Sequence, residues 1–202
     1  RQFGQSPISG VFLNQDGQFV EDPHWSKDHE GRIGMVHGAV WTDVNQDGWM
    51  DLMVATDWGP IRLWQNQGGS WKETTVEAGL EELRGRWRGL SSGDMDDDGD
   101  MDILATNIGR NDDTDGNRAI PHGLLTGSLE GVPHPILVEL YEQNGKVYPL
   151  RTRNALFNGV PSLAERYPSY ESFARVDMDA LIQALPIKNR QILRVHTLDT
   201  GL

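Results

Sequence analysis

A nine-residue acidic segment occurs twice in this chain of 202 residues, and the second copy begins 51 residues after the first. The first acidic loop runs from Asp43 to Asp51 and the second from Asp94 to Asp102. Each has oxygen-bearing side chains at positions 1, 3, 5 and 9, glycine at position 6, and an apolar run directly afterwards. A repeat constrains the fold strongly, because it divides the chain into structural units of similar length.

The second acidic loop concentrates negative charge in very few positions. Six aspartates lie between Gly93 and Leu104: Asp94, Asp96, Asp97, Asp98, Asp100 and Asp102. Such crowding costs free energy comparable to the stability of a whole domain unless a cation neutralises it. Oxygens at positions 1, 3 and 5 of a tight loop, with glycine at position 6, suit a hard cation such as calcium. The alternative is an aspartate-rich turn without metal, and two copies in the same register argue against it.

An EF-hand shares only the first half of this pattern. It needs a bidentate acid at position 12, where the two copies have Val54 and Ala105. The sequence therefore favours a cation-binding loop between two strands over a loop between two helices.

The repeated unit is expected to contain four strands, at residues 38–43, 51–56, 61–65 and 71–75. Residues 11–21 resemble residues 63–73, the second half of that unit. A four-stranded unit that recurs about every 40 to 50 residues is typical of a β-propeller blade. We predict a mainly β fold, a partial β-propeller with blades of four antiparallel strands.

The rest of the chain departs from the repeat. We predict calcium-binding blades over residues 1–111, a degenerate third blade over 112–160, a helical insertion over 161–190, and a strand of a further blade over 191–202. The third blade includes a hairpin at Asn144-Gly145, a dipeptide that favours tight turns.

Two details support this division. A third segment can be aligned with the loop motif, with these residues at positions 1, 3, 5, 6 and 9: Thr126, Ser128, Glu130, Gly131 and His134. It offers only one carboxylate, so we expect a turn without metal. Short helices are expected to begin after Pro161, Ser169 and Asp177, since proline and small polar residues favour helix starts.

The motif D-x-[DN]-x-D-G-x-x-D before an apolar strand resembles the FG-GAP, or VCBS, repeat of integrin α-subunit propellers and of many secreted bacterial proteins. The resemblance covers about residues 10–111, and "VEAGL" (76–80) and "NIGRN" (107–111) resemble the cartilage-acidic-protein-like branch with its bacterial members. It implies an exported protein, secreted or at the cell surface, of which this chain is expected to be a fragment.

The resemblance also implies calcium ligands at positions 1, 3, 5 and 9 and the backbone carbonyl of position 7. The two Ca²⁺ sites would then use Asp43, Asn45, Asp47, the Trp49 carbonyl and Asp51, and Asp94, Asp96, Asp98, the Asp100 carbonyl and Asp102. The second site has one more carboxylate, so we expect it to fill first.

The composition of the chain limits the classes of partner that it is expected to bind. A formal net charge of -12 argues against nucleic acid as a partner, and no apolar run is long enough to cross a bilayer, so no membrane insertion is expected. The chain has no cysteine and therefore neither disulfides nor thiolate metal sites. It is too short to close a ring of blades, so other blades of the same protein or neighbouring chains are expected to complete the propeller or assembly.

The function predicted from these features is a calcium-binding, non-enzymatic module for adhesion, assembly or recognition of a protein or carbohydrate ligand. The alternative is the propeller part of a secreted polysaccharide-acting enzyme. "GLSSG" around Ser91 fits the nucleophile-elbow pattern, but that elbow needs a strand-to-helix turn, and here a metal loop follows. No catalytic pair is evident in the sequence.

Two further groups have both a structural and a binding interpretation. Trp49 and Trp58 could stack on sugar rings, although tryptophans in blades usually pack between sheets. Arg84, Arg86 and Arg88 alternate along the chain and could bind an anionic group, although a solvated face is the simpler reading.

Overall fold

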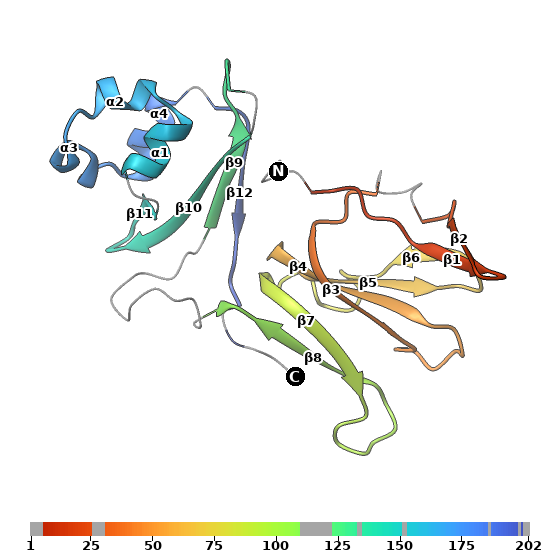
Figure 1. Cartoon of the computed structure of the whole chain (residues 1–202). Helices are drawn as coiled ribbons and strands as arrows, with labels where there is room; N and C mark the ends of the chain where they lie inside the picture. The colour runs from red at the N-terminus through yellow and green to blue at the C-terminus, as the bar shows by residue number, and fades with distance from the viewer. Residues whose placement is uncertain are drawn as a thin grey trace. The chain divides into compact units, whose positions relative to one another are not determined.

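The computed structural model describes residues 6–25, 31–109, 123–132, 135–150, 153–185, 187–197 and 199. The described residues are mainly β, with short helices between residues 153 and 184 (Figure 1). They form two compact units. One holds residues 6–109 and 195–199, and the other holds residues 123–194.

The first unit contains a six-stranded antiparallel sheet, and four of its strands each pair with the next in sequence. These four strands are β3 (Met35–Thr42), β4 (Asp51–Gly59), β5 (Ile61–Asn66) and β6 (Trp71–Glu73). This confirms the predicted four-stranded unit.

Strand β4 is buried on both faces, as expected for a central strand of a blade between two neighbours. Leu52 and Val54 pack with Trp64 and Trp25 in one apolar cluster. The alternate residues, beginning with Met53, pack in a second cluster that includes Trp87 of β7. The period of two along β4 therefore builds two separate cores.

The next strands, β7 (Gly85–Gly93) and β8 (Asp102–Asn107), repeat the first two strands of the blade. The register between β3 and β4 shifts between Val36 and Gly38, and the register between β7 and β8 shifts between Trp87 and Gly89. These bulges lie 51 residues apart, so even the irregularity of the strand pair is repeated.

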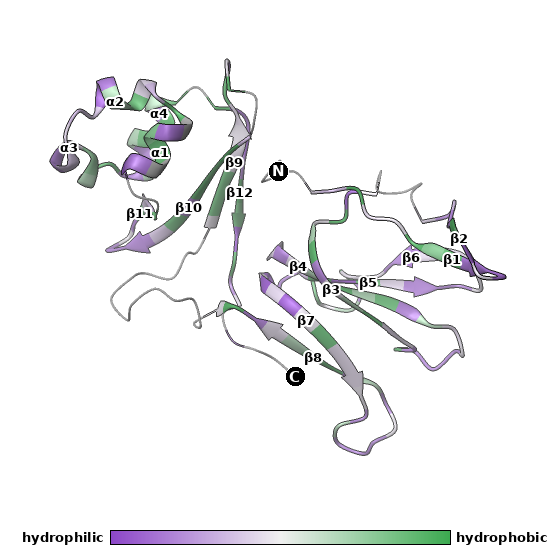
Figure 2. Ribbon diagram, in the orientation of Figure 1, coloured by the Kyte–Doolittle hydropathy of each residue, from purple (hydrophilic) through white to green (hydrophobic). Residues whose placement is uncertain are grey.

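The antiparallel hairpin of β1 (Phe12–Gln15) and β2 (Gln18–Glu21) lies where the internal similarity predicts a copy of β5 and β6. All its residues are exposed, and Figure 2 shows hydrophobic residues along β1. The hairpin is attached to the blade through the buried Asp22, whose carboxylate accepts a 2.9 Å hydrogen bond from the indole N–H of Trp71.

The second unit is a four-stranded antiparallel sheet with four helices, in the strand order β11-β10-β9-β12. The strands are β9 (Gly123–Ser128), β10 (Ile136–Gln143), β11 (Lys146–Pro149) and β12 (Lys188–Arg194). The helices are α1 (Arg153–Gly159), α2 (Ser162–Arg166), α3 (Tyr170–Ala174) and α4 (Met178–Ala184). Side chains of α1, α2 and α4 share one apolar core with β9 and β10.

Several local predictions in this unit are confirmed. Asn144 and Gly145 have φ angles of 54° and 73° in the turn between β10 and β11. Pro161 is the N-cap residue of α2, and the side chains of Ser169 and Asp177 accept hydrogen bonds from the first turns of α3 and α4. Among the described residues, no helix has the length and apolar character needed to cross a membrane.

Other details differ from the prediction. The strand predicted to open a further blade over residues 191–202 is β12, which pairs with β9 and so completes the same sheet. Sequence alternation identifies such a strand but not its partner. Thr126 and Ser128 belong to β9 and do not lie in a loop, while His134 and residues 112–122 lie outside the described residues.

Candidate metal-binding loops

The first acidic loop joins β3 to β4 and is held by its own aspartates. The carboxylate of Asp43 accepts hydrogen bonds from the backbone N–H groups of Asp47 at 3.1 Å and Gly48 at 2.8 Å. The carboxylate of Asp47 accepts one from the N–H of Trp49 at 2.8 Å. Gln46 and Gly48 have φ angles of 57° and 87°, a left-handed conformation that explains the glycine at position 6.

Asp51 ends this loop and is fully buried. Its carboxylate accepts hydrogen bonds from the backbone N–H of Val44 at 3.1 Å and of Asn66 at 2.8 Å. Burial raises the pKa of Asp51, the two N–H donors oppose that rise, and the carboxylates of Asp47 and Asp43 add to it. A cation in the loop would favour the ionised form.

The second acidic loop joins β7 to β8 and repeats these bonds. Asp94 accepts from the backbone N–H of Asp98 at 3.1 Å and of Gly99 at 3.0 Å, and Asp98 accepts from the N–H of Asp100 at 2.9 Å. Asp97 and Gly99 have φ angles of 62° and 94°, matching positions 4 and 6 of the first loop. The repeat in sequence is therefore a repeat in backbone geometry.

Three carboxylates of the second loop converge. Oxygens of Asp94, Asp96 and Asp102 all lie within 4.8 Å of one another. Among the described residues, no lysine or arginine forms an ion pair with a carboxylate of either loop. Calcium binds oxygen at about 2.3 to 2.6 Å, so ligand oxygens around one ion lie within roughly 5 Å of each other. The donor set and spacing of these three residues fit calcium.

The other predicted ligands form local hydrogen bonds. Asp98 bonds to the N–H of Asp100, as described above. In the first loop, Asn45 accepts from the backbone N–H of Asp47 at 3.2 Å, and its amide N–H donates to the Asp47 carboxylate at 3.0 Å. The ligand roles of these residues, and of the Trp49 and Asp100 carbonyls, remain predictions.

Comparison with known families bears on the same segment. Residues 43–105 match the model of the FG-GAP-like repeat, from position 1 of the first acidic loop to the strand after the second. This segment consists of FG-GAP-like repeats. The match supports a β-propeller-type module with a β-rich repeat fold. No curated protein matches the chain.

Within the FG-GAP-like segment, Gln46 connects the two acidic loops. Its side-chain amide donates to the backbone carbonyl of Gly99 at 2.9 Å and to the carboxylate of Asp100 at 2.6 Å. Sequence reasoning missed this contact, because position 4 carries different residues in the two copies and no pattern marks contacts between repeats. The loops are therefore not structurally independent.

A second contact between the FG-GAP-like repeats centres on Asp57, whose side chain is 11% exposed. Its carboxylate accepts from Arg86 at 3.3 Å and from Arg88 at 2.9 Å. Arg88 also lies 2.5 Å from Nε2 of His37, its counterpart in the other repeat. Burial, and then the Arg88 charge, lower the pKa of His37, while Asp57 opposes the shift. These two arginines therefore have internal partners.

The remaining candidates from the sequence are two tryptophans and Ser91, and the exposure of each tryptophan decides whether it can bind a ligand. Trp58 is buried beneath the guanidinium of Arg86, 4.9 Å from the ring centre, so it packs as tryptophans in blades usually do and is not available to stack on sugars. Trp49 is 52% exposed and remains available. Ser91 lies within β7, not at a strand-to-helix turn, so the nucleophile-elbow geometry is not formed there.

Proposed function

We propose that the two acidic loops each bind one Ca²⁺ and that the ions stabilise a non-enzymatic, propeller-type module. The observation that carries the proposal is the convergence of the Asp94, Asp96 and Asp102 carboxylates without a counter-charge from the described residues. The residues that would hold the ions are Asp43, Asn45, Asp47, Trp49 through its carbonyl, and Asp51, with Asp94, Asp96, Asp98, Asp100 through its carbonyl, and Asp102.

The bound ion would supply the positive charge that the loops lack. Each loop joins neighbouring strands, so an ion bound only in the folded state adds its binding free energy to folding. All the candidate donors are carboxylate, amide or carbonyl oxygens, which suit a hard cation. We also propose a secreted or cell-surface location, where calcium modules bind with dissociation constants of about 10⁻⁴ to 10⁻³ M.

Calorimetric titration of the metal-stripped chain with calcium tests this proposal. We expect two sites, with the second loop filling first. Asp96→Asn, which gives the second loop the position-3 residue of the first, should weaken the tighter site. Asp97→Asn is the matched control, since it removes the same charge at position 4, outside the converging group. Absence of binding at about 10 mM calcium, well above the weakest constant expected, refutes the proposal.

We further propose that the module recognises a protein or carbohydrate ligand near the first loop. The exposed ring of Trp49 supports this, because aromatic side chains offer a large contact area. Binding on a glycan or protein array that is lost in Trp49→Ala supports the proposal. Chelator-sensitive cleavage of a polysaccharide by the chain would instead support the polysaccharide-acting enzyme.

The exposed hairpin supports a proposal about assembly. By the internal repeat, β1 corresponds to β5, which pairs with β4 as well as β6, whereas β1 pairs only with β2 among the described residues. Phe12 and Phe19 are 59% and 72% exposed. We propose that strands of another blade, from the same protein or a neighbouring chain, cover this edge. Sedimentation should show self-association that Phe19→Ser weakens, and a compact, stable monomer would contradict it.

A further inference from the structure

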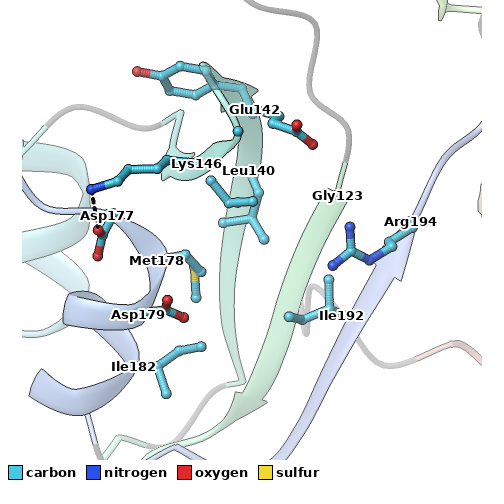
Figure 3. A pocket seen from close by; sticks show the side chains of 13 residues that line it. Gly123, Leu140, Glu142, Lys146, Asp177, Met178, Asp179, Ile182, Ile192 and Arg194 are labelled. Atoms are coloured by element: carbon cyan, nitrogen blue, oxygen red, sulfur yellow. Dashed lines mark ion pairs between the residues drawn. The ribbon is translucent and has the colours of Figure 1, made fainter.

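A hollow of about 400 Å³ lies in the unit formed by residues 123–194, at the end of the sheet beside α4 (Figure 3). Gly123 of β9 pairs with Leu140 of β10 on one side and Arg194 of β12 on the other. A methyl group at Gly123 would lie 3.6 Å from the side chains of both Leu140 and Ile192. The glycine thus leaves open a space between its neighbours, and the volume lies in the range of about 300 to 1,000 Å³ typical of ligand pockets.

The hollow has an apolar interior and one internally matched pair of charges. Its apolar surface comes from both the sheet and the helix: Leu140, Val147, Met178, Ile182 and Ile192. Lys146 lies 3.7 Å from the carboxylate of Asp177, which also accepts a hydrogen bond from the first turn of α4. This pair needs no further partner.

Three other charged side chains at the hollow have no hydrogen-bond or ion-pair partner among the described residues: Glu142, Asp179 and Arg194. They come from three different elements, β10, α4 and β12. Figure 3 shows Asp179 and Arg194 extending toward the hollow from opposite sides, with the apolar residues between them. Opposite charges that face one space without pairing can each bind a group of opposite sign on one molecule.

We propose that this hollow binds a small zwitterion with an apolar body, either a free apolar amino acid or a short peptide with free ends. Arg194 binds the carboxylate through its planar pair of N–H donors, and Asp179 binds the ammonium. The apolar body lies over Leu140 and Met178. A simple anion is disfavoured by Glu142 and Asp179, and a neutral apolar ligand would leave Arg194 and Asp179 without a partner.

Titration of the ¹⁵N-labelled full chain, followed by two-dimensional NMR, tests the proposal with four probes. The probes are L-leucine, N-acetyl-L-leucine without the ammonium, L-leucinamide without the carboxylate, and the dipeptide Leu-Leu. We expect L-leucine to bind and each blocked derivative to bind about ten- to a hundredfold more weakly, as expected for loss of one charged hydrogen-bond partner. Tighter binding of the dipeptide would identify a peptide ligand, and tighter binding of leucine a free amino acid.

Two variants connect the binding to the named charges. Arg194→Gln should weaken L-leucine about tenfold or more without further weakening L-leucinamide, and Asp179→Asn should weaken L-leucine without further weakening N-acetyl-L-leucine. Arg190→Gln, on the same strand but outside the hollow, is the control for lost charge. The proposal is overturned if neither L-leucine nor Leu-Leu binds, if both variants leave the affinity of the bound probe unchanged, or if the control weakens that affinity equally. The calcium proposal is unaffected by any of these results.

Discussion

Replacing Asp96 with asparagine should change the stability of the protein in opposite directions with and without calcium. Oxygens of Asp96, Asp94 and Asp102 lie within 4.8 Å of one another. Two unit charges at that distance repel by about 0.9 kcal/mol in water. Removing one carboxylate therefore relieves roughly 2 kcal/mol of repulsion, which screening at physiological salt reduces to about 1 kcal/mol.

The ion reverses this balance. A carboxylate about 2.4 Å from a divalent cation contributes roughly 3 kcal/mol of attraction, even with the dielectric constant of water. The variant therefore gains about 1 kcal/mol in chelator and loses about 2 kcal/mol, net, with both sites filled. The compact unit that holds this loop has roughly 110 residues, and a domain of that size shifts its melting temperature by about 4 °C per kcal/mol. The melting temperature should therefore rise by about 4 °C in chelator and fall by about 8 °C in calcium.

Thermal denaturation followed by circular dichroism, once with excess chelator and once with calcium well above both dissociation constants, checks this expectation. Asp97→Asn is the control, because asparagine tolerates the left-handed conformation of Asp97 and this position supplies no predicted ligand. It should melt higher than the parent under both conditions. A drop for Asp96→Asn that is equal in chelator and calcium would mean that the carboxylate has a structural role unrelated to an ion.

Three other perturbations follow from contacts between the repeats. Gln46→Ala removes two exposed hydrogen bonds between the loops. Calorimetry should show that the calcium affinities of the two sites change by up to about tenfold and that any coupling between the sites disappears. Unchanged affinities would show that this contact does not influence calcium binding. The folded-state pKa of His37 is lowered, so the stability that depends on its neutral form is complete above its usual pKa and is lost as pH falls below that value. The free energy of unfolding from urea denaturation should therefore vary less with pH between 7.5 and 5 in His37→Gln than in the parent. Parallel pH dependences of the two proteins would refute this. Asp57→Asn leaves Arg86 and Arg88 close together without the shared carboxylate. Urea denaturation should show that the free energy of unfolding falls by about 1 to 3 kcal/mol. An unchanged free energy of unfolding would mean that the other contacts of the two arginines hold them in place without Asp57.

The blade was predictable because its information is local and occurs twice. The continuous apolar run in Asp51–Gly59 specifies a strand buried on both faces, and glycine at position 6 specifies a left-handed turn. The helix starts after Ser169 and Asp177 were predictable for the same reason, since a capping side chain bonds within its own first turn. Such features need no knowledge of distant partners.

Contacts between distant segments were not predictable in this way. β12 has the alternation of a strand, but nothing in Lys188–Arg194 indicates that β9 is its partner. Helix α1 was missed because a segment as short as Arg153–Gly159 is a marginal helix by itself, and its apolar side chains share the core with the sheet. Asp57 contacts residues of two other strands, and the sequence of no single strand indicates this contact.

The two acidic loops differ in a way that sets charge against pre-organisation. Asp51 is held by two backbone donors, one of them from Asn66 on the third strand of its blade, whereas the carboxylate of Asp102 accepts, among the described residues, a hydrogen bond only from the backbone N–H of Met95. Better positioning favours the first loop by about 1 kcal/mol, the usual net value of one hydrogen bond. The additional carboxylate of the second loop favours that loop by roughly 3 kcal/mol. Charge therefore outweighs positioning, and filling of the first loop before the second would refute this order.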